Sequence, residues 1–201
     1  MSAFLGPIHY WLYNKIQIQQ NIVDEIHSRY GLSLKEECDV RYGEFDNRPL
    51  EEIIDQSNIH GWLQERVSQV EYKYAYSIKA LLDKDPSLLS QLEELLTLKG
   101  RELGQNLKET SKTAALLFKV ISDNLLDGMP CDHANSLVEN SDDRLVWKRN
   151  LCVHEDYWAA VGADISIYYR LREAWIKGLV DVSGFTFKKI DSVTYSIEKA
   201  A

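Results

Sequence analysis

Histidine and cysteine supply the reactive side chains that stand out in this chain of 201 residues, because they occur in two repeated patterns. Residues 8–12 read IHYWL and residues 59–63 read IHGWL, while residues 131–133 read CDH and residues 152–154 read CVH. Imidazoles exchange protons near neutral pH and bind metals, and thiolates attack electrophiles. Two such repetitions suggest that these positions share a site.

The Cys-x-His pattern could form a metal site. Residues two apart on a strand point to the same face, so Cys131 could act with His133, and Cys152 with His154. If the two segments were adjacent, the four side chains would make a tetrahedral zinc site with two sulfur and two nitrogen ligands. The spacing is not a familiar zinc pattern, and buried structural thiols with one hydrogen-bonded histidine each explain it more simply.

Cys152 could instead be a nucleophile. It follows a predicted strand and precedes an acidic segment that resembles the start of a helix, where the helix dipole stabilises a thiolate. His154 or His133 would then be the general base of a thiol-dependent hydrolase. Acidic residues in a first helical turn need no catalytic explanation, so the structural alternative stays open.

The Ile-His-x-Trp-Leu pattern lies at the start of two predicted helices, 51 positions apart. The helices could be a duplication with pseudo-two-fold packing, in which His9 and His60 face the same surroundings. Two such imidazoles could line a ligand pocket with Trp158, bind one zinc ion, or hold a haem between them. The alternative is that Ile, Trp and Leu are core contacts and each histidine bonds a nearby backbone group.

The elements that position these residues follow from apolar spacing and from capping residues. The pattern predicts helices over residues 7–30, 49–56, 86–98 and 102–127, and a further helix that is capped by Asn58 and runs to about residue 83. Residues 31–48 are expected to be irregular. Gly100 and Gly104 are expected to break the long leucine-rich segment, although they could instead allow a close crossing with another helix.

The last third of the chain has a mixed character. Strands are expected over residues 135–138 and 144–151, a short helix after Cys152, and a helix capped by Asp164. Residues 183–198 alternate apolar and polar side chains and predict a hairpin. We therefore expect an α+β protein, a helical bundle packed on a small antiparallel sheet, in one domain of residues 1–201 with a mainly helical part, 1–128, and an α+β part, 129–201.

Composition limits the partners. The formal net charge is −8, which argues against nucleic acid and against an anionic membrane surface. Three widely spaced cysteines and the lack of a signal-peptide pattern at the start predict reduced thiols in the cytoplasm. A homo-oligomer is compatible with the aromatic stripes on the predicted helices.

Two stretches resemble known families. Residues 4–16, FLGPIHYWLYNKI, resemble the start of a group of uncharacterised bacterial proteins, which implies no activity. Residues 152–187 are similar to the C-terminal half of the L-2-amino-thiazoline-4-carboxylate hydrolase-like family. The shared features are a cysteine, the sequence Gly162-Ala163-Asp164 and a helix that leads into Gly184-Phe185. This resemblance adds to the expectation of a cysteine hydrolase.

The sequence therefore favours a protein that binds a small ligand or a metal in a pocket lined by His, Cys and Trp side chains. A thiol-dependent hydrolase and a non-catalytic helical interaction or dimerisation module are the alternatives.

Overall fold

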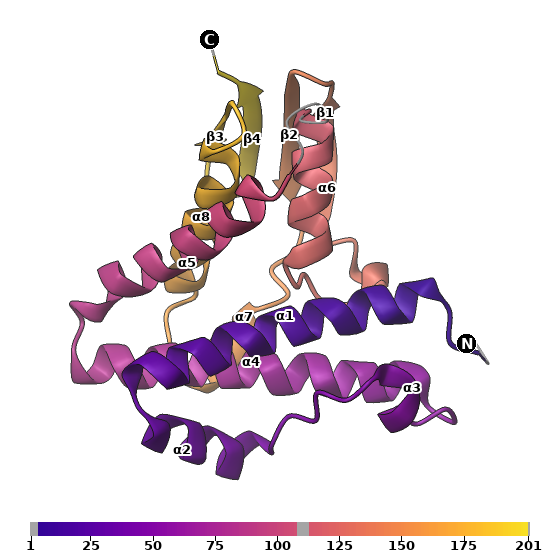
Figure 1. Ribbon diagram of the computed structural model, residues 1–201, viewed down its shortest axis with the longest axis vertical. Helices are drawn as coiled ribbons and strands as arrows, with labels where there is room; N and C mark the ends of the chain where they lie inside the picture. Colours follow the sequence, from indigo (N-terminus) through magenta and orange to yellow (C-terminus); the bar gives the residue numbers. More distant parts are fainter. Residues whose placement is uncertain (1–3, 108–112, 201) are drawn as a thin grey trace. The chain divides into compact units, whose positions relative to one another are not determined.

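The computed structural model describes residues 4–107 and 113–200, which form two compact units (Figure 1). Unit 1 comprises Met1–Asp85, Asp123–Cys131 and His154–Ala163. Unit 2 comprises Pro86–Ser122, Asp132–Val153 and Asp164–Ala201. The described part of unit 1 contains helices without strands, whereas unit 2 holds a four-stranded sheet, so the predicted α+β class is confirmed. Across the described residues, none of the helices is both long and apolar enough to span a membrane.

In its described residues, unit 1 is built on two long helices and three shorter ones. Its helices are α1 (Pro7–Tyr30), α2 (Leu32–Tyr42), α3 (Leu50–Ile53), α4 (Ile59–Lys84) and α7 (Glu155–Ala160). Asn58 caps α4 as predicted, because its side chain accepts a hydrogen bond from the Gly61 backbone N–H.

Helices α1 and α4 lie side by side and run in the same direction (Figure 1). His9 near the start of α1 meets His60 near the start of α4, and His27 near the end of α1 meets Ser77 near the end of α4. The partners in these contacts are 51 and 50 positions apart. The two Ile-His-x-Trp-Leu patterns, which we call the helix echo, are also 51 positions apart, so their spacing is kept along the helix pair.

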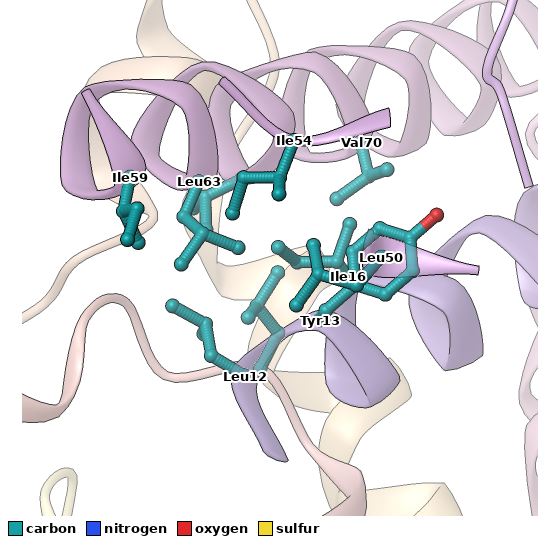
Figure 2. Packing of buried hydrophobic residues seen from close by; sticks show 10 residues of the cluster. Leu12, Tyr13, Ile16, Leu50, Ile54, Ile59, Leu63 and Val70 are labelled. Atoms are coloured by element: carbon teal, nitrogen blue, oxygen red, sulfur yellow. The ribbon is translucent and has the colours of Figure 1, made fainter. Parts of the chain in front are cut away.

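A shared apolar core joins the two helices and the short α3 (Figure 2). The equivalent residues Leu12 of α1 and Leu63 of α4 are both buried in it, as are Ile16 and Val67. Because matching positions of the echo supply matching core residues, packing accounts for its apolar part, as the alternative interpretation held.

The prediction that residues 31–48 are irregular is wrong over α2. Leu34 and Cys38 lie one turn apart and are both buried, and Lys35 forms an ion pair with Asp39 four residues later. Two buried residues on one face and one ion pair were too weak a periodic signal in a segment rich in charge. The helix ends at Gly43, whose φ of 82° lies in the left-handed region.

Unit 2 contains an antiparallel sheet with the strand order β1-β2-β4-β3. Its strands are β1 (Asn135–Asn140), β2 (Arg144–Arg149), β3 (Phe185–Lys189) and β4 (Thr194–Lys199). The predicted hairpin over residues 183–198 is confirmed as β3 and β4. Trp147 of β2 pairs with Tyr195 of β4, and their rings stack in the core of this unit.

The helices of unit 2 correct one prediction. They are α5 (Leu88–Gln105), α8 (Ile165–Asp181) and most of α6 (Ala114–Asn124). Gly100 and Gly104 do not break α5. A methyl group at Gly100 would overlap the carbonyl oxygen of Trp175 in α8, and one at Gly178 would overlap that of Thr97 in α5. The glycines therefore allow the close helix crossing that was the alternative. The predicted helix 102–127 includes residues 108–112, which lie outside the described residues.

Candidate functional site

The two histidines of the helix echo meet at the start of α1 and α4. The Nε2 atoms of His9 and His60 are 3.4 Å apart, and the ring centroids are 5.5 Å apart with the planes tilted by 46°. The expectation that these imidazoles converge is confirmed. They converge because the two helices are parallel and each carries its histidine in the first turn.

A backbone hydrogen bond fixes how the pair shares its protons. The N–H of Gly6 donates to Nδ1 of His9 at 2.9 Å, so His9 reaches back over the start of its own helix. In a neutral imidazole the acceptor nitrogen carries no hydrogen, so the hydrogen of His9 is on Nε2. Nε2 of His9 then donates to Nε2 of His60, which leaves the hydrogen of His60 on Nδ1.

This histidine pair borders a cavity of about 190 Å³ in unit 1. Its walls come from the first two turns of α1 and α4, from Met129 and from the short 3₁₀ helix η2 (Pro130–Asp132). They are formed by Ile8, His9, Leu12, His60, Leu63, Met129, Pro130 and Cys131. Ile8, His60 and Cys131 are exposed, so the cavity opens to the surface between them. The site is a mainly apolar pocket with two imidazoles and one thiol.

The pocket does not fit zinc or haem. A zinc ion bound by Nε2 of His9 would need that lone pair, but the Gly6 N–H leaves the hydrogen there. Within residues 4–107 and 113–200, no group of three or more His, Cys, Asp or Glu side chains could hold a metal ion. A porphyrin exceeds the size of drug-like ligands, whose pockets begin at about 300 Å³, and this cavity is smaller than that.

Cys131 and His133 do not have the geometry of the predicted strand. Cys131 lies in η2, and His133 follows it with a φ of 48°, in the left-handed region. The argument that both side chains share one face is therefore wrong. Cys131 faces the histidine cavity, whereas His133 is exposed and its carbonyl oxygen accepts a hydrogen bond from Asn150.

Cys152 has a different neighbour from the one expected. The hydroxyl of Tyr169 donates to its sulfur at 3.1 Å, and the guanidinium of Arg149 lies over the Tyr169 ring. Burial, followed by the hydrogen bond to Cys152, raises the pKa of Tyr169. Among the described residues, Tyr169 is the hydrogen-bond partner of Cys152, and no histidine is.

His154 sits between two carboxylates in the interior of unit 1. Its Nδ1 lies 3.0 Å from Oε1 of Glu71, and its Nε2 lies 3.6 Å from Oδ1 of Asp127. Because both ring nitrogens face carboxylates, His154 has no lone pair for activating a thiol. Trp158 is also fully buried, in a T-shaped ring contact with Tyr74, and it does not line the histidine cavity.

A second polar cluster, which the sequence did not indicate, lies between α1, α2 and α4. His27 and Cys38 both contact the Ser77 hydroxyl, and the buried Lys73 binds Asp39. The available signal was a lysine at position 73, inside the apolar stripe of α4 that contains Val70 and Tyr74. A lysine on a buried helix face requires an acidic partner.

Comparisons of this chain with protein-family models, with curated proteins and with solved structures found no match. The candidate site is therefore interpreted from its own geometry.

Proposed function

We propose that this protein binds a small, mainly apolar molecule that carries one hydrogen-bond acceptor, in the cavity beside His9 and His60. The observation that supports this function is the combination of apolar walls with a histidine pair whose protons are ordered by Gly6. In this proposal the Nδ1–H of His60 is the donor for the ligand. A reducing cytoplasmic location is part of the proposal, since all three cysteines are free thiols.

The size of the cavity limits the ligand. An apolar cavity of about 150 Å³ is large enough for a benzene ring, so the 190 Å³ cavity suits one ring with a small substituent. Leu12, Leu63 and Met129 supply the apolar surface for that ring. We propose a ligand of this size whose oxygen faces the imidazoles.

Phenol and benzene are suitable probes for this function. We expect phenol to shift the NMR signals of the His9 and His60 ring protons in a saturable manner. Benzene should bind roughly two- to tenfold more weakly because it lacks the hydrogen bond. The variant His60→Phe should remove this difference. Phenol that leaves both histidine signals unchanged would contradict the proposal.

A steric variant provides a second test. Ile8 is 49% exposed at the mouth of the cavity, so Ile8→Trp should narrow the opening without disturbing the core and should weaken phenol binding. Tyr10→Trp is the matched control, because Tyr10 is 44% exposed two positions away and does not line the cavity. Equal phenol affinity in the two variants would place the binding site elsewhere.

Thiol chemistry at Cys131 is a second candidate, favoured by the position of this thiol in the same cavity as two imidazoles. In this candidate function, Cys131 takes the place of Cys152 as the nucleophile of a thiol-dependent hydrolase. If this candidate is correct, the Cys131 thiolate attacks the carbonyl carbon of a small phenyl ester and displaces phenoxide to form a thioester, while the Nδ1–H of His60 donates to the carbonyl oxygen. His60→Phe should then slow this reaction, and Cys152→Ser should leave it unchanged. Equal rates in His60→Phe and the parent protein would exclude it.

A further inference from the structure

Unit 1 contains another cavity, of about 130 Å³, whose walls are charged rather than apolar. It is formed by three helices, α1, α2 and α4, and by the segment that follows α2. Its walls are the side chains of Gln20, Asp24, Lys35, Asp39, Glu44, Phe45, Asn47 and Lys73. None of these residues lines the histidine cavity, so the two pockets are separate.

Gln20 is one of the residues that line this cavity, and its side chain carries an unsatisfied acceptor. The side chain is 5% exposed, and its Nε2 donates to Oδ1 of Asp24 at 2.7 Å. Only the amide nitrogen can donate to a carboxylate, so this bond fixes the orientation of the amide and identifies the other atom as oxygen. Oε1 of Gln20 is buried and has no hydrogen-bond partner among the described residues. A buried polar atom of this kind requires a partner from outside the chain.

Lys73 lines the same cavity and has unused donors. Its side chain is 1% exposed, and its Nζ lies 2.5 Å from Oδ1 of Asp39. The other oxygen of Asp39 is bound by Lys35, also at 2.5 Å, so one carboxylate is shared by two ammonium groups. An ammonium has three N–H donors, and Asp39 is the hydrogen-bond partner of Lys73 within the described part of the chain. Two donors of a buried cation are therefore available.

Around this cavity, both positive and negative side chains therefore lack a full set of oppositely charged partners. Lys35 and Lys73 share Asp39, while the carboxylates of Asp24 and Glu44 also line the cavity. An anion alone would meet Asp24 and Glu44, and a cation alone would meet Lys35 and Lys73. A molecule that carries both charges would satisfy both sets.

We infer that this cavity binds a small zwitterion, an α-amino acid with a short side chain. Its carboxylate would accept hydrogen bonds from Lys73 and Lys35. Its ammonium group would donate to Oε1 of Gln20 and to the carboxylates of Asp24 and Glu44. The volume equals the share of about four water molecules, which suits glycine, alanine or serine, with Phe45 as the apolar wall for the side chain.

Glycine and L-alanine are the probes for the experiment, and the Gln20 side-chain amide is the reporter in ¹H–¹⁵N NMR spectra. We expect L-alanine to shift this signal in a saturable manner. Acetate and methylammonium each carry half of the recognised charge, so each should bind at least about tenfold more weakly. The zwitterion assignment is overturned if either half-ligand binds as tightly as L-alanine. A Gln20 signal that neither glycine nor L-alanine shifts indicates a cavity filled by water alone and also overturns it.

Substitutions give a matched comparison. Gln20→Met removes the buried acceptor at similar volume and should weaken L-alanine binding about tenfold. Gln19→Met is the control, since Gln19 is 8% exposed, is adjacent in sequence and does not line the cavity. For a surface comparison that leaves the core intact, Glu44→Gln should weaken binding about threefold and Glu36→Gln should not. Unchanged binding in Glu44→Gln and in a folded Gln20→Met would overturn the assignment, whatever phenol does at the other cavity.

Discussion

Nδ1 of His154 lies 3.0 Å from Oε1 of Glu71, and both side chains are buried, at 2% and 3% exposure. Burial alone would lower the pKa of this imidazole. The carboxylates of Glu71 and Asp127 overcome that effect and raise the pKa of His154 to about 9. His154 is therefore a buried cation at neutral pH, held between two anions.

The stability of unit 1 should consequently fall in alkaline solution. His154 binds its proton more tightly in the folded protein, with a pKa of about 9, than in the unfolded chain, with a pKa near 6.5. Its contribution is complete below pH 6.5 and is lost as the pH rises through 9, by up to about 3 kcal/mol. Denaturant unfolding followed by the Trp158 indole signal measures this loss. The same decline in His154→Gln would assign it to another group.

Removal of the cation alone should cost more than removal of both charges. His154→Leu leaves Glu71 buried without a counter-charge and should lower the free energy of unfolding by about 3–5 kcal/mol. The double variant H154L/E71M replaces the pair by apolar side chains and should recover at least half of that loss. Equal stability of the single and double variants, measured by denaturant unfolding, would show that the two side chains are not coupled.

The crossing of α5 and α8 should not tolerate alanine. In an exposed helix, Gly→Ala stabilises by about 1 kcal/mol, but a methyl group at Gly178 would overlap the Thr97 carbonyl oxygen. We expect Gly178→Ala to destabilise unit 2 by about 2 kcal/mol or more. Arg101→Ala, at an exposed position of α5, is the control and should change stability by less than about 0.5 kcal/mol. The thermal midpoint of the signal from Trp147 reports both, and a higher midpoint in Gly178→Ala would contradict the close crossing.

The three thiols should react with iodoacetamide in order of exposure. Cys131 is exposed, Cys152 is half-buried and Cys38 is buried. Burial also raises the pKa of Cys38, which reduces the thiolate fraction at neutral pH. Mass spectrometry of timed samples should show Cys131 modified first and Cys38 modified only after unfolding. Early modification of Cys38 in folded protein would mean that α2 opens readily.

Local signals in the sequence predicted a large part of the fold. The caps at Asn58 and Asp164 and the hairpin over 183–198 depend on neighbouring residues, and all three are present in the structure. The contact between His9 and His60 could be predicted from the sequence, because a repeated pattern implies repeated packing. Cys38 shows the limit of such local signals: its burial in α2 raises the pKa of its thiol more than its acidic neighbours do, and that burial depends on packing against distant residues.

The parts that could not be predicted depend on partners distant in sequence. The break expected at Gly100 follows from the helix propensity of glycine, and only the backbone of α8 explains why the glycines are there. The role expected for His154 beside Cys152 assumed that neighbours in sequence act together. Its actual partner is Glu71, 83 positions away, and no periodicity of the sequence records that pairing.

The interleaved order of the two units has a consequence for synthesis on the ribosome. Unit 1 begins with the first helix but is completed by His154–Ala163, after most of unit 2 has been translated. Until residue 154 leaves the exit tunnel, Glu71 lacks the imidazolium that neutralises it, and the α1–α4 pair must wait with one face uncovered. The nascent chain therefore holds an incomplete unit 1 until its last segment is synthesised. A pause in translation shortly before codon 154 would prolong the exposure of this incomplete unit to proteases and chaperones.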